Sequence, residues 1–159
     1  MKKAFLFIAC FAFVIMLFSG FASESTAPSI GYVAPEFKLT DNNKTLSLHN
    51  LKGENVLVTF WSSTNADSRI RCNQYDAFSA YDNSVRHLAI NLDQDKDLFE
   101  QIVILDNMTA SMQYHIEGGI ADEIMSDYHL DRGLHSFLIN NTGKIVAIDP
   151  DADTMKSLL

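Results

Sequence analysis

Cysteine and histidine are the residues of this sequence that could carry redox or metal chemistry. The chain has 159 residues, with two cysteines, Cys10 and Cys72. A zinc site needs imidazoles and a carboxylate spaced so that they share one helix or strand face, and the five histidines do not show that spacing. The sequence therefore predicts no metal site and no cofactor. The histidines are His49, His87, His115, His129 and His135.

The first 22 residues have the features of an export signal. Lys2 and Lys3 precede an almost unbroken apolar run over residues 4–19, and Gly20-Phe21-Ala22 supplies the small residues that a signal peptidase requires. We predict cleavage after Ala22 and an exported, periplasmic or otherwise extracytoplasmic protein. The alternative is an uncleaved anchor, because this run approaches the ~20 apolar residues that span a bilayer.

After the signal, the sequence divides into a linker and one domain. Residues 23–30 are small, polar and contain a proline, which predicts a linker, and residues 31–159 form the domain. Loss of Cys10 with the signal leaves Cys72 alone, so the mature chain cannot form an intramolecular disulfide. Twelve basic residues against 20 acidic ones give a net charge of −8, which argues against a nucleic-acid partner.

The first half of the domain predicts a hairpin, a strand and a helix. Alternating apolar residues over 37–48 predict a β-hairpin, and the apolar run 55–61 predicts a central strand covered on both faces. A helix is expected over about 66–81, with Asn65 or Thr64 at its N-cap. Its buried stripe is predicted at four large side chains, Ile70, Tyr75, Phe78 and Tyr81.

The second half continues the alternation of strands and helices. We predict a strand over 85–92, a helix with its apolar face at Leu98, Phe99, Ile102, Val103 and Leu105, and a second helix carrying Ile120, Ile124, Met125 and Tyr128. Two strands over 134–139 and 144–148 then form an antiparallel hairpin, and a short helix with Met155 ends the chain. This order predicts an α/β fold in which a mixed sheet carries helices on both faces.

Two segments resemble the thioredoxin superfamily, in particular its TlpA-like exported thiol-disulfide oxidoreductases and related peroxiredoxin-like proteins. The first, residues 30–61, includes Ala34-Pro35-x-Phe37, Leu51-Lys52-Gly53 and Trp61. The second is Y-H-L-D-R-G-L-H-S-F-L-I-N-N-T-G-K-I-V-A, residues 128–147. The resemblance implies a thioredoxin-like three-layer fold with an N-terminal β-hairpin, and thiol-disulfide exchange as the family activity.

The residues that perform this chemistry in the family are replaced here. The family places Cys-x-x-Cys four residues after the tryptophan, where this chain has Asn65-Ala66-Asp67-Ser68. In the family, the start of the helix lowers the pKa of the attacking thiol, and neither Asn65 nor Ser68 can supply a thiolate. Leu134 stands at the family's cis-proline position. Because a cis bond before a non-proline residue costs about 2.5–4 kcal/mol, we expect the peptide bond before Leu134 to be trans.

Several polar residues near this motif have alternative interpretations. Cys72 could be a reactive thiol, since it lies one turn after Ser68, but a structural cysteine is favoured. Arg69 and Arg71 could hold an anionic ligand, although solvated surface residues are favoured, and Asp67 is explained by the helix dipole. Ser68 and His135 could form a nucleophile and base, but no third orienting residue is evident, so hydrolase chemistry is not favoured.

These observations lead to three hypotheses. The first is a redox-inactive domain that binds a peptide or protein in a groove between two loops; the groove residues are Trp61, Thr64, Asn65, Gly133, Leu134 and His135. The second is a thiol oxidoreductase or peroxidase-like enzyme that acts through Cys72. The third is a structural module tethered to a membrane, which would contact the membrane only if the signal segment is retained.

Overall fold

The computed structural model of this chain describes residues 27–41 and 44–159. The predicted signal therefore lies outside the described residues, as do the first residues of the predicted linker. In the part that is described, no helix combines the length and the apolar character needed to cross a membrane.

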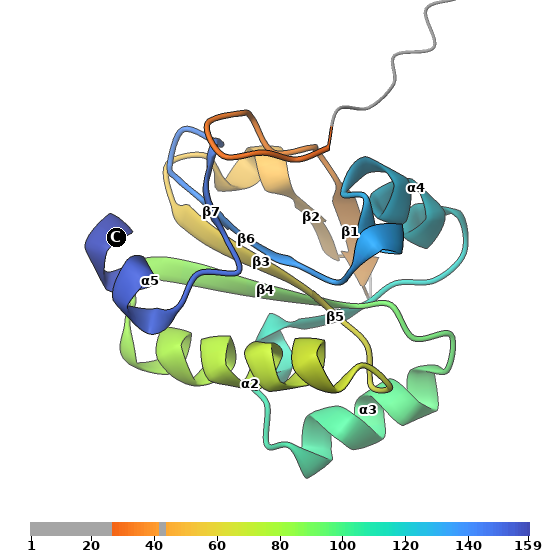
Figure 1. The fold of residues 1–159 in the computed structure, drawn as a ribbon. Coiled ribbons are helices and arrows are strands. Elements are labelled where there is room, and N and C mark those ends of the chain that lie inside the picture. The colour runs from red at the N-terminus through yellow and green to blue at the C-terminus, as the bar shows by residue number, and fades with distance from the viewer. Residues whose placement is uncertain (1–26, 42–43) are drawn as a thin grey trace, which may run out of the picture.

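The centre of the molecule is a mixed five-stranded sheet (Figure 1). Its strand order is β5-β4-β3-β6-β7, with β3–β4 and β4–β5 parallel and β3–β6 and β6–β7 antiparallel. The strands are β3 (Asn55–Trp61), β4 (Val85–Asn91), β5 (Gln113–His115), β6 (Ser136–Ile139) and β7 (Ile145–Ile148). β3 lies in the middle, as its unbroken apolar sequence predicts.

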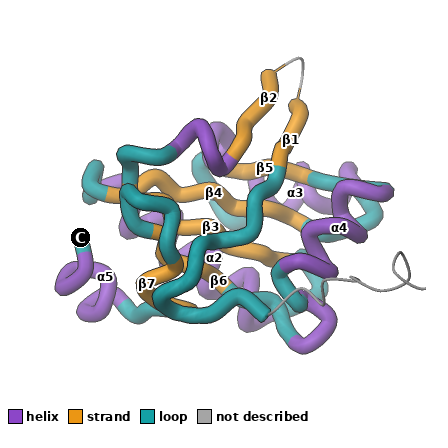
Figure 2. The backbone as a smooth tube through the Cα atoms, turned by 90° about the horizontal axis from the view of Figure 1, so that it is seen from above, coloured by secondary structure: helices purple, strands orange, loops and turns teal. Residues whose placement is uncertain are grey.

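Two layers cover this sheet. One face carries α2 (Ala66–Tyr81) and α3 (Lys96–Leu105), and α5 (Ala152–Leu158) packs through Met155 into the apolar cluster of that face. The other face carries α4 (Gly119–Asp127) and a separate two-stranded sheet of β1 (Lys38–Asp41) and β2 (Lys44–Ser47), which crosses above the main strands (Figure 2). The predicted three-layer fold with an N-terminal hairpin is confirmed.

The outer edge of β7 is occupied by the beginning of the domain. The Gly31 N–H donates to the carbonyl of Ile145 at 2.8 Å, and the Ile145 N–H donates to the carbonyl of Tyr32 at 2.9 Å. The Ala34 N–H completes this pairing by donating to the carbonyl of Gly143 at 3.0 Å. Residues 31–34 thus satisfy backbone groups that an edge strand would otherwise present to other chains.

The predicted stripe of α2 is partly wrong. The helix spans the expected residues, but Ile70 and Tyr81 are 56% and 93% exposed. The buried positions are instead Ser68, Cys72, Tyr75, Asp76 and Ser79. Ile70 and Tyr81 each follow a buried serine by two residues, about 200° around the helix axis, and therefore point away from the sheet.

Smaller differences affect the other elements. Leu105, Ile120 and Met125, predicted to be apolar-face residues, are exposed. β6 begins at Ser136 rather than Leu134, so the preceding residues form a loop. The short strand β5 was not predicted, because its sequence Q-Y-H has neither an apolar run nor alternation.

Candidate functional site

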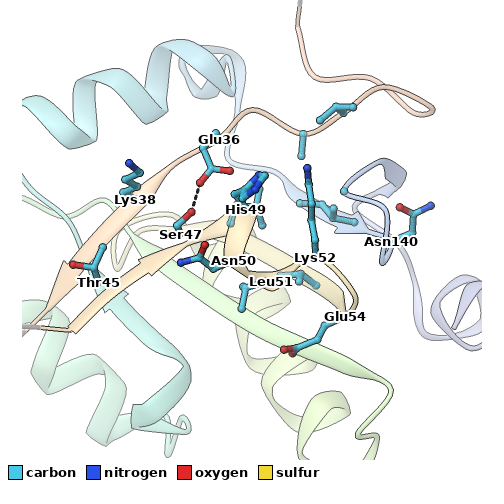
Figure 3. Close-up of a pocket in the computed structure, with 16 residues that line it drawn as sticks. Glu36, Lys38, Thr45, Ser47, His49, Asn50, Leu51, Lys52, Glu54 and Asn140 are labelled. Atoms are coloured by element: carbon cyan, nitrogen blue, oxygen red, sulfur yellow. Dashed lines mark hydrogen bonds between the residues drawn. The ribbon is translucent and has the colours of Figure 1, made fainter.

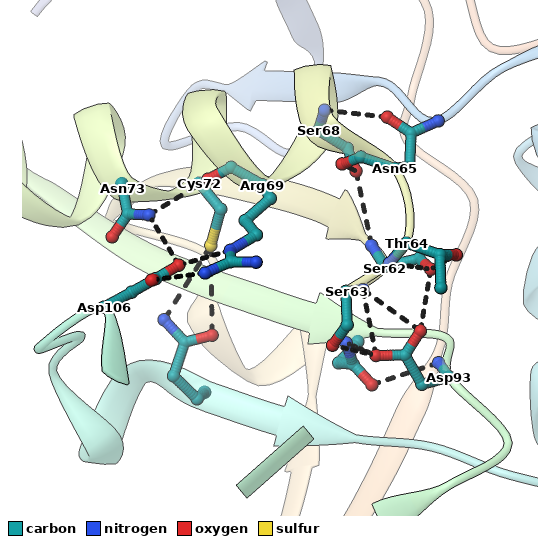
Figure 4. Close-up of polar contacts among 12 residues, drawn as sticks. Ser62, Ser63, Thr64, Asn65, Ser68, Arg69, Cys72, Asn73, Asp93 and Asp106 are labelled. Atoms are coloured by element: carbon teal, nitrogen blue, oxygen red, sulfur yellow. Dashed lines mark hydrogen bonds and ion pairs between the residues drawn. The ribbon is translucent and has the colours of Figure 1, made fainter. Parts of the chain in front are cut away.

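The loop between β3 and α2 occupies the place of the predicted redox motif (Figure 4). Asp93, just beyond the end of β4, holds this loop. Its carboxylate accepts hydrogen bonds from Ser62 Oγ at 2.7 Å, Ser63 Oγ at 2.5 Å and Ser63 N at 3.0 Å. Although partial burial opposes the shift, the hydrogen bonds from Ser63, Asn91 and Ser62 hold the pKa of Asp93 below its usual value. The loop is therefore tied to the sheet by a charged acceptor.

Both motif positions are engaged in structural hydrogen bonds. Asn65 is the N-cap of α2, because its Oδ1 accepts from the Ser68 N–H at 2.9 Å. Ser68 is fully buried; its Oγ donates to the Asn65 carbonyl at 3.0 Å and accepts from the Ser62 N–H at 3.3 Å. Asn65 was correctly predicted as a cap. Neither side chain presents a nucleophile to solvent.

Cys72 lies on the buried face of α2 and has no exposed surface. Its Sγ is 3.9 Å from the side-chain amide of Gln113, which is buried on β5. Burial raises the pKa of the Cys72 thiol to about 12, with the negative charges of Asp76 and Asp106 adding to the shift and Gln113 opposing it. A thiol with this pKa remains protonated at neutral pH, so it is a poor nucleophile. The burial agrees with the favoured structural interpretation and is more complete than predicted.

Arg69 is paired with a carboxylate of the fold, which corrects the favoured prediction of a solvated surface side chain. Its Nε and one terminal nitrogen each lie 2.5 Å from the carboxylate oxygens of Asp106, which follows α3. Asn73 Nδ2 donates to the same carboxylate at 3.1 Å. The hydrogen bonds from Arg69 lower the pKa of Asp106. This bidentate pair joins the first turns of α2 to the end of α3.

Arg71 joins α2 to the loop at the family's cis-proline position. A terminal nitrogen of Arg71 donates to the Leu134 carbonyl, and Arg71 Nε lies 3.4 Å from Asp149 Oδ1 in an ion pair. The peptide bond before Leu134 is trans, as expected, since the described residues contain no cis peptide bond. Like Arg69, Arg71 is used within the fold, which corrects the prediction of a solvated side chain.

His135 has an orienting partner that sequence reasoning missed. Its Nδ1 lies 2.6 Å from Asp149 Oδ2, while Asp149 Oδ1 accepts from the Ser136 N–H at 2.7 Å. Asp149 follows β7, whose pairing with β6 brings it beside His135. Ser68, the imagined nucleophile, is buried and hydrogen-bonded elsewhere. The histidine–aspartate pair therefore does not activate Ser68 as a nucleophile.

The predicted groove residues lie at one end of the sheet, but they do not contribute equally. The Phe60 N–H donates to the His135 carbonyl at 3.1 Å, which places the end of β3 beside the loop at 133–135. Thr64 and Asn65 are exposed, and Gly133, Leu134 and His135 are half-buried. Trp61 is completely buried and packs against Phe99, so it cannot line a groove as predicted. We call the five remaining residues the motif surface.

The site also depends on residues that were not singled out from the sequence. Asp93, Asp106 and Asp149 each hold a loop or helix by charge-assisted hydrogen bonds. Their positions in the sequence could have indicated this role, because each is an acidic residue directly after a predicted strand or helix. Within residues 27–41 and 44–159, no group of three histidine, cysteine, aspartate or glutamate side chains could hold a metal ion.

Comparisons with known proteins support the fold. No family model matches the sequence, and no curated protein matches it. A thioredoxin-like protein from Parabacteroides distasonis has a similar structure, with 27% sequence identity, a TM-score of 0.71, and coverage of 83% of this chain and 95% of that one.

Two further similar structures belong to proteins whose names state an activity. The thioredoxin domain of a thiol-disulfide oxidoreductase from Bacteroides vulgatus is 22% identical, with a TM-score of 0.69 and coverage of 83% and 96% of the two chains. A thiol:disulfide interchange protein from Bacteroides sp. is 20% identical, with a TM-score of 0.68 and coverage of 84% and 89%. The predicted resemblance to the thioredoxin superfamily is confirmed, and this chain is a thioredoxin-like protein by its fold.

Proposed function

We propose that this protein is a thioredoxin-like domain that lacks thiol-disulfide exchange activity and binds a peptide or protein segment at the motif surface. The observation that carries the proposal is the state of the motif positions. Asn65 caps α2, Ser68 is buried, and Cys72 is a fully buried thiol with a pKa raised to about 12. Thiol exchange requires an accessible thiolate, which none of these residues supplies.

The binding role rests on how the motif surface is held. Asp93 fixes the loop before α2, and Arg71 and Asp149 fix the loop that carries Leu134 and His135. A surface held in this way loses little conformational entropy when a partner binds. Thr64, Asn65 and the partly exposed His135 offer polar groups beside the partly exposed Leu134, a combination that suits a polypeptide segment. The predicted export signal supports a place for this function outside the cytoplasm.

The loss of exchange activity is tested by insulin reduction in the presence of dithiothreitol. The purified protein should not accelerate the reaction, whereas the variant N65C/S68C/L134P should regain measurable exchange, because it restores the thiols and the proline of the family motif. Substantial activity in the unmodified protein that disappears in Cys72→Ser would instead support the thiol-enzyme hypothesis.

The binding role is tested with peptides selected on the purified protein from a phage-displayed library. Thr64→Arg should weaken their binding at least fivefold, because it places a long charged side chain on the motif surface. Gln74→Arg is the matched control, since Gln74 is an exposed residue of α2 outside that surface. Equal effects of the two substitutions, or selected peptides that ignore both, would refute the proposed location.

A further inference from the structure

A large concave feature lies at the opposite end of β3 from the motif surface (Figure 3). It is a cavity of about 620 Å³ between the segment 33–38, the end of β2, the turn over 48–52 and the β6–β7 connection. Val56, near the start of β3, lines it, whereas the motif surface adjoins the other end of that strand. Its volume falls within the ~300–1,000 Å³ typical of small-molecule sites.

The interior of this cavity is apolar. Leu48, Leu51, Val56 and Ile139 line it, and each of these side chains is otherwise packed in the main core. These four side chains are only 1–7% exposed, and Val33, which also lines the cavity, is 65% exposed, so that together they form its apolar wall. Such a wall favours a ligand with an apolar body.

The charged residues around the cavity differ in whether they have partners. Glu36 accepts a hydrogen bond from Ser47 Oγ at 2.5 Å, and Glu54 pairs with Arg86 at 2.8 Å. The side chains of Lys52 and His49, in contrast, have no hydrogen-bond or ion-pair partner among the described residues. Figure 3 shows the His49 and Lys52 side chains next to each other at the cavity.

The unpaired donors favour a ligand that carries a negative charge. The acidic groups of the cavity are already engaged, whereas an ammonium and an imidazole remain free to act as donors. The unpaired Lys52 ammonium lies in a chain whose net charge is −8, with 20 acidic residues available as partners. A small anionic group at the opening would supply acceptors to both Lys52 and His49.

We propose that this cavity binds a small organic monocarboxylate, with its carboxylate at Lys52 and His49 and its apolar body against Val33, Leu48 and Leu51. The Lys52 ammonium and the His49 imidazole would face a single carboxylate, whereas Lys38, the other lysine of the lining, lies apart from them on the β1 side of the cavity in Figure 3. The lining contains no arginine and does not present the bidentate donors that phosphate groups favour. The site is separate from the motif surface, so its test is independent of the proposed function.

Titration calorimetry with 4-phenylbutyrate tests the proposal, because this probe combines a carboxylate with an apolar body. The probe should bind with at least tenfold higher affinity than 4-phenylbutanol or 4-phenylbutylamine, which keep the body and change the head group. Amide chemical shifts of residues 48–52 and 139–143 should change on titration. Equal binding of the three compounds, or shift changes confined to other residues, would refute the site.

Three substitutions separate the contributions of charge and shape. Lys52→Gln should weaken binding of 4-phenylbutyrate about tenfold, the loss expected when a hydrogen bond to a charged group is removed. Asn50→Phe should weaken it by at least as much, because Asn50 is an exposed residue that lines the cavity, and the larger ring would fill it. Lys144→Gln is the charge control, since Lys144 is exposed nearby but does not line the cavity. A loss in Lys144→Gln equal to that in Lys52→Gln would show only general electrostatic attraction and overturn the proposal.

Discussion

Asn65 and Ser68 use their polar atoms to hold the first turn of α2 and the loop before it. Asn65 accepts from a backbone N–H that the helix leaves free, and Ser68 bonds the backbone on both sides of the motif loop. An N-cap of this kind contributes about 1 kcal/mol to stability. The residues at the redox positions thus contribute to folding, and they leave no acidic thiol where exchange would need one.

Single residues were predictable to the extent that their partners are local. The cap at Asn65 could be predicted because its acceptor and donor lie three residues apart in the chain. The pairing of His135 with Asp149 spans 14 residues and depends on the β6–β7 register. Arg69 and Asp106 are 37 residues apart. The burial of Trp61 likewise depends on how α3 packs, which composition does not reveal.

His87 provides a pH-dependent prediction at this scale. Its Nε2 lies 3.0 Å from Thr59 Oγ1, and burial lowers its pKa to about 3. The unfolded chain protonates His87 near pH 6.5, so its contribution to stability is fully present above that pH and is lost as the pH falls toward 3. Urea denaturation should therefore show lower stability at pH 4.5 than at pH 7.5.

The variant His87→Gln isolates this contribution. Glutamine keeps a polar group near Thr59 but does not titrate. The unfolding free energy that is lost between pH 7.5 and 4.5 should therefore be smaller in the variant by about 1–3 kcal/mol. This is less than a full proton difference would give over the whole interval, at ~1.4 kcal/mol per pH unit. An unaltered pH dependence in His87→Gln would contradict this explanation.

Secondary-structure elements were predicted well where the sequence shows a clear period. The apolar strand at 55–61 and the helix at 66–81 were located correctly. The inward face of α2 was not, because small and polar residues fill it. Ser68, Cys72, Tyr75 and Ser79 follow the helical period, but an apolar scale gives most of them little weight. β5 was not predicted, because its three residues, Q-Y-H, show no apolar periodicity.

Asp149 links several elements and gives a prediction at this scale. It adopts φ +47°, accepts from the Ser136 N–H, and pairs with His135 and Arg71. Asp149→Ala should reduce the unfolding free energy by about 2–4 kcal/mol, because it leaves the buried Ser136 N–H without its acceptor and retains a strained backbone. Chemical denaturation measures this loss.

Asp149→Asn serves as the matched variant. Asparagine tolerates a left-handed backbone and keeps an oxygen for Ser136, but it gives up the negative charge that faces Arg71 and His135. Its loss of stability should be less than half that of Asp149→Ala. If the two variants were equally destabilised, the ion pairs rather than the Ser136 hydrogen bond would dominate the role of this residue.

The whole molecule has a thioredoxin-like architecture. The surfaces at the two ends of its central strand, β3, differ in the kinds of residue that they expose. One end holds the motif surface, where polar side chains are tied down by Asp93 and Asp149. The other holds the cavity at Lys52 and His49. Similar structures at 20–27% identity show that this fold tolerates wide sequence change. The sequence could predict the shared architecture from strand order, whereas the cavity arises from segments 33–56 and 139–143 that meet only in three dimensions.

The predicted export signal gives a prediction for the whole molecule. N-terminal sequencing of the protein recovered from the cell envelope should begin at Ser23, because Gly20-Phe21-Ala22 ends the apolar run with small residues. Ala22→Arg should block this processing, and Ala27→Arg, beyond the predicted cleavage position, should not. Recovery of an intact N-terminus together with membranes would instead support the tethered hypothesis.

The attachment of residues 31–34 to β7 has a consequence for how the chain is made. The first part of the domain to emerge from a ribosome or translocation channel finds its hydrogen-bonding partners at Gly143 and Ile145, which are synthesised much later. Until that late strand arrives, the opening segment has no place on the sheet. This edge of the sheet can therefore close only after the β6–β7 hairpin has been synthesised.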